Sequence, residues 1–206
     1  SNNDSGTSNT VFGKTAGDSD GAGDLNVFIG ELAGGTGTQT DDADSNVGIG
    51  YRALTDLTEG THNIAIGKDS ATNILGGDMN IAIGGDTLYT STAAINSIAI
   101  GKNAIYAGTA TVAGTIAIGY DALRNVSDGA GNIAVGYSAL NALTSGANNL
   151  AIGYQAGAAI VGGAGNTLVG TSCATAWDAE SNNTAVGYDA MNGGVNGADS
   201  CVAVGK

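Results

Sequence analysis

Acidic side chains in two polar stretches near the N-terminus are the residues best suited to chemistry. Carboxylate oxygens are the ligands that Ca²⁺ takes in proteins, and carboxylates held close together repel unless a cation lies between them. The spacing matches neither the EF-hand loop nor the glycine-rich calcium nonapeptide. We therefore favour solvated loops and keep a calcium site as the alternative. The candidate ligands are Asp18, Asp20, Asp24, Asp41, Asp42 and Asp44.

If successive turns stack, Asp24 and Asp41 should lie together, because each follows a repeated glycine by eleven residues. Other reactive side chains are scarce. His62 is the only histidine, so neither a Ser–His–Asp nor a Cys–His arrangement can be argued. Cys173 falls in a small-residue column of the repeat and Cys201 in the asparagine column, and both are predicted to be core or corner substitutes that do not pair. We predict no catalysis; a glycan-active enzyme with paired carboxylates in a groove is the catalytic alternative.

Composition excludes several classes of partner. The chain has 206 residues, 36 glycines, no proline and a formal net charge of −13. Six Lys and Arg residues cannot form the basic patch that nucleic acid or an anionic membrane requires. No apolar run approaches the ~20 residues needed to span a bilayer, so membrane insertion is not expected.

A short motif, Asn–apolar–Ala–Ile/Val–Gly, recurs along almost the whole chain and must position every side chain named above. Successive glycines are 17, 18 or 20 residues apart, and residues 132–136 give a typical copy, NIAVG. Such regularity is the signature of a repeat fold. The motif glycines are Gly13, Gly30, Gly50, Gly67, Gly84, Gly101, Gly119, Gly136, Gly153, Gly170, Gly187 and Gly205.

Each motif is predicted to be a short strand that ends at its glycine. The residue before the glycine is Ile, Val or Phe in all twelve copies, and a mostly β-branched residue stands two positions earlier. Side chains two apart on a strand share a face, so we expect these two columns to point into one core. A 17-residue unit cannot bury its apolar face alone, and stacked units can.

The fold class is therefore predicted as all-β, a parallel β-solenoid (β-roll) of about twelve 17-residue turns. Residues 9–206 would form a single repeat domain after a polar lead segment at 1–8. At the usual strand spacing the rod would be roughly 55 Å long. The three extra residues before Gly50 predict a loop that bulges at 41–44.

Asparagine begins most copies of the motif. We interpret this column as a ladder of stacked amides that bond to one another and to the backbone; a row of ligand-binding amides is the alternative. Ser97, Thr115 and Cys201 stand in the remaining copies. The asparagines are Asn9, Asn26, Asn46, Asn63, Asn80, Asn132, Asn149, Asn166 and Asn183.

The residue between the two β-branched columns is alanine in eight copies and is predicted to point away from the core. An exposed apolar strip invites association, so we interpret it as contact with a second copy of the chain. Cover by a loop of the same chain is the alternative. The alanines are Ala65, Ala82, Ala99, Ala117, Ala134, Ala151, Ala185 and Ala203.

Tyrosine follows the glycine in five copies and lysine in four. We expect the tyrosines of three consecutive turns to stack as an aromatic ladder, with a glycan-binding strip as the alternative. Ice binding is not favoured, because a regular outward threonine array is absent. The residues are Tyr51, Tyr120, Tyr137, Tyr154 and Tyr188, and Lys14, Lys68, Lys102 and Lys206.

Segments such as 63–67 (NIAIG) and 97–101 (SIAIG) resemble the head repeats of trimeric autotransporter adhesins. The longer form at 183–191 (NTAVGYDAM) is similar to repeats of phage tail-fibre and related bacterial surface proteins. The resemblance covers residues 9–206 and implies a left-handed roll, three chains side by side, and an extracellular, cell-surface or virion location. This repeat is longer than the usual adhesin repeat of near fourteen residues.

The expected function is that of a structural and adhesive fibre module, a stiff rod that presents loops to a cell-surface glycan or protein receptor. The alternative is a filament subunit that stacks end to end through uncapped strand edges.

Overall fold

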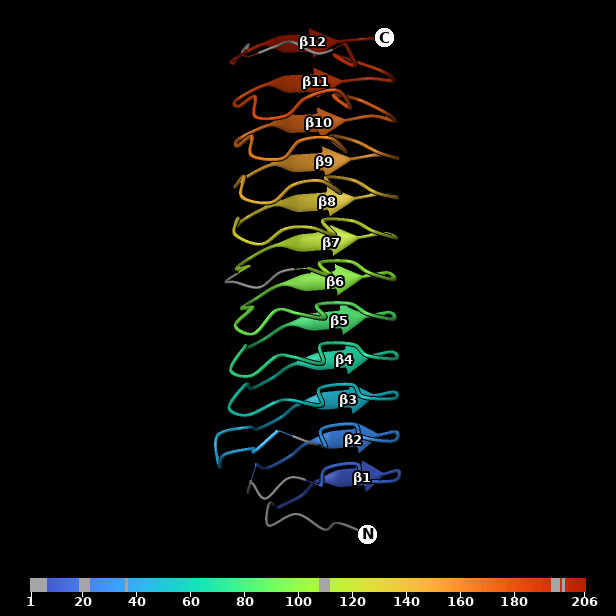
Figure 1. The fold of residues 1–206 in the computed structure, drawn as a ribbon, viewed down its shortest axis with the longest axis vertical. Helices are drawn as coiled ribbons and strands as arrows, with labels where there is room; N and C mark the ends of the chain where they lie inside the picture. Colours follow the sequence, from blue (N-terminus) through green and yellow to red (C-terminus); the bar gives the residue numbers. More distant parts are fainter. Residues whose placement is uncertain (1–6, 19–22, 36, 108–111, 194–196, 198) are drawn as a thin grey trace.

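The computed structural model describes all residues except 1–6, 19–22, 36, 108–111, 194–196 and 198. The described residues form one twelve-stranded parallel sheet whose strands follow the order of the chain (Figure 1). Each strand has three residues. The strands are β1 (Thr10–Phe12), β2 (Val27–Ile29), β3 (Val47–Ile49), β4 (Ile64–Ile66), β5 (Ile81–Ile83), β6 (Ile98–Ile100), β7 (Ile116–Ile118), β8 (Ile133–Val135), β9 (Leu150–Ile152), β10 (Thr167–Val169), β11 (Thr184–Val186) and β12 (Val202–Val204).

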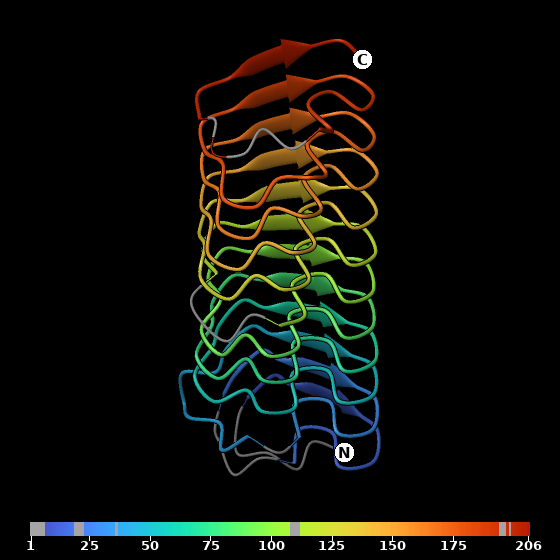
Figure 2. The ribbon, with the colours of Figure 1, turned by 45° about the horizontal axis from the view of Figure 1, so that its top comes forward.

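Equivalent residues of the repeat are paired at every step of the sheet. Ile64 pairs with Ile81, and Ile81 pairs with Ile98. Figure 2 shows the chain leaving each strand, returning on the other side of the rod and entering the next strand one level higher. The predicted parallel β-solenoid is therefore confirmed, with one turn of chain between successive strands.

The motif glycine ends each strand for two reasons that act together. Gly136 has φ of +141°, a conformation that L side chains rarely adopt, and a Cβ there would collide with the carbonyl oxygen of Gly153 one turn on. The following segment forms a turn, so each repeat contributes one strand to the sheet.

The predicted direction of the strand side chains is wrong. The middle residue of each strand faces the core: Ala99, Ala117 and Ala134 are fully buried. The residues on either side face outward, and Ile118 and Ile152 are 37% and 40% exposed. The alanine column is therefore no contact surface for a second copy, and the β-branched columns are not the core.

The physical reason is the narrow interior of the roll. Opposite each strand the returning chain supplies a second buried column, which includes Leu123 and Leu140, and this leaves room for little more than a methyl group. Larger inward residues occur where the opposite column has a glycine. A Cβ at Gly157 would lie 2.7 Å from Leu168 Cδ1, and one at Gly34 would lie 2.6 Å from the Phe28 ring.

The three extra residues before Gly50 form the predicted loop. The chain between β2 and β3 extends further from the rod than the neighbouring turns in Figure 1. Asp41 and Asp42 are exposed at this loop, while Ala43 is buried and keeps its place in the stack.

Candidate functional surface

The asparagine column forms a buried ladder that uses its own amide groups. The backbone N–H of Asn149 donates to Asn132 Oδ1 at 2.9 Å, and Asn149 Nδ2 donates to the same oxygen at 3.1 Å and to the Gly163 carbonyl at 2.8 Å. The same pattern links Asn149 to Asn166. The ladder interpretation is confirmed, and these amides are engaged in holding turns together.

Aspartates that lie two residues before this column act as braces between turns. Asp44 accepts a hydrogen bond from the Asp24 backbone N–H at 2.6 Å, and Asp78 accepts one from the Thr61 N–H at 2.7 Å. Asp24 in turn accepts a hydrogen bond from the Thr7 N–H, and this bond is the main reason that the pKa of the Asp24 carboxyl is lowered. Asp24 thus stacks with Asp44 and not with Asp41, because the bulged loop absorbs the three extra residues before the ladder resumes.

The six candidate calcium ligands do not converge in the part of the chain that is described. There, no three His, Cys, Asp or Glu residues gather in a geometry able to hold a metal ion. Asp18, Asp41 and Asp42 are exposed, and Asp20 lies outside the described residues. The calcium site stays a prediction.

An open depression near the C-terminal turns is lined by Asp178, Ala179, Glu180, Gly197 and Asp199. The Glu180 carboxylate accepts hydrogen bonds from the backbone N–H groups of Gly197, Asp178 and Ala179, at 3.1, 2.8 and 3.0 Å. These bonds, that from Gly197 foremost, lower the pKa of Glu180. The carboxylate is therefore occupied by the backbone and is not arranged as a proton donor.

The scarce reactive residues occupy structural positions. His62 is exposed, in the left-handed conformation (φ +57°), with its backbone N–H bonded to the Asp44 carbonyl. Cys173 replaces an alanine in a buried column, and burial raises its pKa to about 11, so its thiol stays protonated at neutral pH. Cys201 replaces an asparagine, and both cysteines are free.

The tyrosine column contains the predicted ladder. The rings of Tyr120, Tyr137 and Tyr154 stack in succession with centroids 5.2 Å apart and interplanar angles of 10° and 13°. Both faces of the Tyr137 ring are covered by its neighbours. A sugar ring packs against an aromatic face, so this geometry favours the structural interpretation over a glycan-binding strip.

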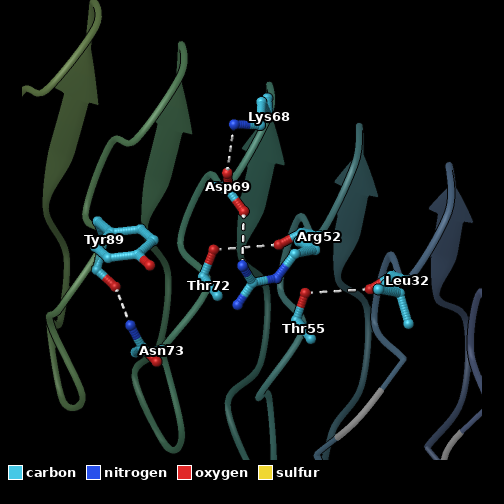
Figure 3. Close-up of polar contacts among 8 residues, drawn as sticks. All are labelled: Leu32, Arg52, Thr55, Lys68, Asp69, Thr72, Asn73 and Tyr89. Carbon is cyan, nitrogen blue, oxygen red and sulfur yellow. Dashed lines mark hydrogen bonds and ion pairs between the residues drawn. The ribbon is translucent and has the colours of Figure 1, made fainter.

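A charged corner lies beside the tyrosine column, between β3 and β5. Asp69 is buried and makes ion pairs with Lys68, at 3.1 Å, and with Arg52 of the preceding turn, at 3.4 Å (Figure 3). The hydrogen bond and charge of Asp69 raise the pKa of Lys68. Thr72 donates to the Arg52 carbonyl at 3.2 Å and adds a second link between the same turns. The corner is thus a brace between turns and not an open site.

The most extensive candidate surface is the outer face of the sheet, which sequence reasoning assigned to the core. We define the outer face as the side chains of the first and third residues of β1–β12. It carries Ile, Val, Leu, Thr and Phe and no charged residue. Ile64, Ile66 and Ile83 are 36%, 37% and 37% exposed. The sequence did contain a sign that the middle column faces inward: a large residue in that column is paired with a glycine, as Leu168 is with Gly157.

Comparisons with models of protein families, with curated proteins and with solved structures find no match. Within the described residues, no helix has the length and apolar character that a membrane crossing requires.

Proposed function

We propose that this chain is a structural module of an extracellular fibre, of the tail-fibre or adhesin-head type, on a cell surface or virion. It is a stiff rod whose copies associate side by side through the outer face and whose loops contact a receptor. The observation that carries the proposal is the uncharged apolar face that runs the length of the rod.

Stiffness follows from the stack itself. Every step carries the parallel pairing of three residues, and most steps add the asparagine ladder, whose bonds are buried from water. Side-chain braces such as Asp44 to Asp24 act across turns as well. Contacts of this kind resist bending because each turn is held to the next at several points around its circumference.

The outer face has the size and chemistry of a contact between copies. With strands ~4.8 Å apart, a strip ~10 Å wide along the rod presents on the order of 500 Å² per copy, or ~1,000 Å² for two, near the lower limit for a specific interface. Its side chains are mostly β-branched and have few rotamers to lose on association. Ile133 and Val135, for example, stand on one strand with no charge beside them in either column.

Three chains around a common axis suit this face. The two outward columns of each strand lie ~7 Å apart, so a chain can offer one column to each of two neighbours. Head-to-tail contacts of that kind close into a ring, and three is the number that the sequence resemblance implies.

The test is the molar mass in solution, measured by light scattering at several concentrations. Three chains of 19.9 kDa predict a constant mass of about 60 kDa. A double variant, Ile118→Lys with Ile152→Lys, should dissociate the assembly by placing cations in the outer face. A matched control, Leu75→Lys with Val161→Lys, changes residues that are 42% and 40% exposed but lie off the sheet, and should keep the mass. A wild-type monomer of about 20 kDa would overturn the association.

Attachment is tested separately by binding of the assembled rod to a glycan array and to candidate host cells, with a depolymerisation assay on any glycan bound. Binding without hydrolysis supports an adhesive module, and hydrolysis would show an enzyme instead.

The second candidate is a filament subunit that stacks end to end. The observation that favours it is the exposure of apolar side chains on the first and last described strands, where Phe12, Val202 and Val204 are 76%, 74% and 77% exposed. A mass that rises without limit with concentration would favour this candidate.

A further inference from the structure

The asparagine ladder is interrupted in the middle of the rod. At a regular step, Asn149 makes two hydrogen bonds to Asn132 Oδ1, of 2.9 and 3.1 Å. Between β6 and β7 the column has Ser97 and Thr115, and one long bond of 3.4 Å, from the Thr115 N–H to Ser97 Oγ, replaces these two bonds, although Ser97 Oγ still donates to the Val112 carbonyl at 2.9 Å. At the following step, from Thr115 to Asn132, no ladder bond is present among the described residues.

A buried column of the core is weakened one turn earlier. Leu57, Ile74, Val126, Leu143 and Ile160 share an inward position after the motif glycine. The equivalent residue that follows β5 is Ser91, which is fully buried and whose hydroxyl has no hydrogen-bond partner. A small side chain with an unsatisfied polar atom therefore stands where other turns pack a large apolar one.

An aromatic stack on the outside of the rod spans the same turns. The rings of Tyr89 and Tyr106 stack with centroids 5.3 Å apart, and the Arg124 guanidinium lies 5.0 Å from the Tyr106 centroid. Arg124 is also held by an ion pair of 3.4 Å with Asp121. This stack links the turns that follow β5, β6 and β7, near the interrupted ladder and the buried Ser91.

We propose that the two steps from β6 to β7 and from β7 to β8 form a joint at which the rod opens first, so that β1–β6 and β8–β12 behave as two cooperative units, with Tyr89, Tyr106 and Arg124 bracing the β6 side of the joint from outside. In a stack where each turn contacts only its neighbours, stability is a sum of local terms, and opening begins at the weakest step. The strand pairing of β6 with β7 is intact, so the joint is closed in the native rod. A fibre with such a joint yields under load at a set place.

Hydrogen exchange of single backbone amides tests the proposal directly. The Ile98 N–H to Thr115 carbonyl bond and the Gly119 N–H to Ile100 carbonyl bond, both 2.8 Å, cross the joint. Equivalent bonds at a regular step are Ile133 N–H to Asn149 and Gly153 N–H to Val135, of 2.8 and 2.9 Å. Once each observed rate is compared with the intrinsic exchange rate of the same amide, a difference in protection reports a difference in the free energy of opening. We expect the amides that cross the joint to exchange at least about tenfold faster in the assembled protein.

Two pairs of variants localise the effect. Asn149→Ser should create a second weak step and speed exchange of the Ile133 amide, whereas Ser97→Asn with Thr115→Asn should slow exchange at the joint. Tyr106→Ala should speed exchange at the joint, and the matched control Tyr137→Ala, taken from the other tyrosine stack, should not.

Equal protection along β4–β10 in the wild-type protein would overturn the proposal, as would a Tyr137→Ala effect at the joint as large as that of Tyr106→Ala. If the Ser97→Asn, Thr115→Asn variant does not fold, the wild-type exchange profile alone still decides the question.

Discussion

Two facing columns of side chains share the limited volume inside each turn. Ala134 and Ala151 are fully buried on the strand side, and Leu123 and Leu140 are fully buried on the returning side. Where the strand side has Leu168, the returning side has Gly157, at which a Cβ would lie 2.7 Å from the leucine. The two columns therefore compensate for each other, as the dense packing of protein interiors requires.

This compensation can be tested by a double-mutant cycle. Leu140 precedes Ala151 by eleven residues, the separation between Gly157 and Leu168. We expect Ala151→Leu alone to lower the free energy of unfolding by about 1–3 kcal/mol through overpacking. Combining it with Leu140→Gly should recreate the native Leu168–Gly157 pair and give a favourable coupling of about 0.5–3 kcal/mol, measured by chemical denaturation. Additive effects would show that the two columns do not share space.

Many non-glycine residues adopt the left-handed conformation at fixed positions of the repeat. The residue before the ladder column is Met79 in one turn, with φ of +56°, and Gly131 and Gly165 in others, with φ of +70° and +69°. A non-glycine residue in the left-handed conformation costs roughly 1–2 kcal/mol, and the surrounding stack of turns holds the residue in this conformation despite the cost.

Replacement by glycine at such a position should therefore stabilise the protein. Met79 is 54% exposed, so its side chain contributes little packing. We expect Met79→Gly to raise the free energy of unfolding by about 0.5–1 kcal/mol, after the entropic cost of glycine in the unfolded chain is subtracted. Met79→Ala retains the strain and serves as the control in the same denaturation experiment; an equal gain for alanine would contradict the explanation.

At the scale of single elements, the sequence predicts the features that recur in every repeat. It does not predict features that depend on how the turns fit together in space. All twelve strands lie where the motif placed them, the ladder and the tyrosine stack formed, and the loop at 41–44 bulges as expected. The prediction that Asp24 stacks on Asp41 was wrong, because the bulged loop changes the number of residues between equivalent positions of successive turns. The prediction that the β-branched residues face inward was wrong, because the width of the roll, and not hydrophobicity, selects alanine over isoleucine for the interior.

The turn around Glu180 predicts a specific acid sensitivity. Three backbone N–H groups hold the carboxylate, so its pKa in the folded protein lies below the ordinary value of 4.5. A group with a lowered folded pKa contributes stability at higher pH, and this contribution is lost as the pH falls from about 4.5 through the folded pKa. We expect Glu180→Gln to be less stable than the wild type at pH 7 and to lose less stability between pH 5 and pH 3.

Thermal midpoints of the two proteins across this range provide the measurement. The comparison cancels the change in self-repulsion as the other acids of a chain with net charge −13 are titrated. Parallel curves for the two proteins would contradict the assigned role of Glu180.

For the whole molecule, the sequence predicts the architecture, but it only reduces the number of classes of function that are compatible with the chain. Periodicity settles that turns stack, because no single turn can bury its apolar residues. It does not settle which surface meets a partner, since the alanine column and the outer face both repeat along the full rod. Exposed fractions show which of the two is accessible to a partner: Ala151 is fully buried and Ile152 is 40% exposed. The surface that we propose for association could therefore be identified only once the fold was known.

The shape of the assembly in solution separates lateral from end-to-end association. A single rod is roughly 55 Å long at the usual strand spacing. Lateral association of three chains should triple the mass while small-angle X-ray scattering shows a nearly unchanged longest dimension and a larger cross-section. End-to-end stacking should add roughly 55 Å per chain at constant cross-section. The Ile118→Lys, Ile152→Lys variant should return the cross-section to that of one chain only if the outer face joins the copies, so an unchanged cross-section in that variant would place the contact elsewhere on the rod.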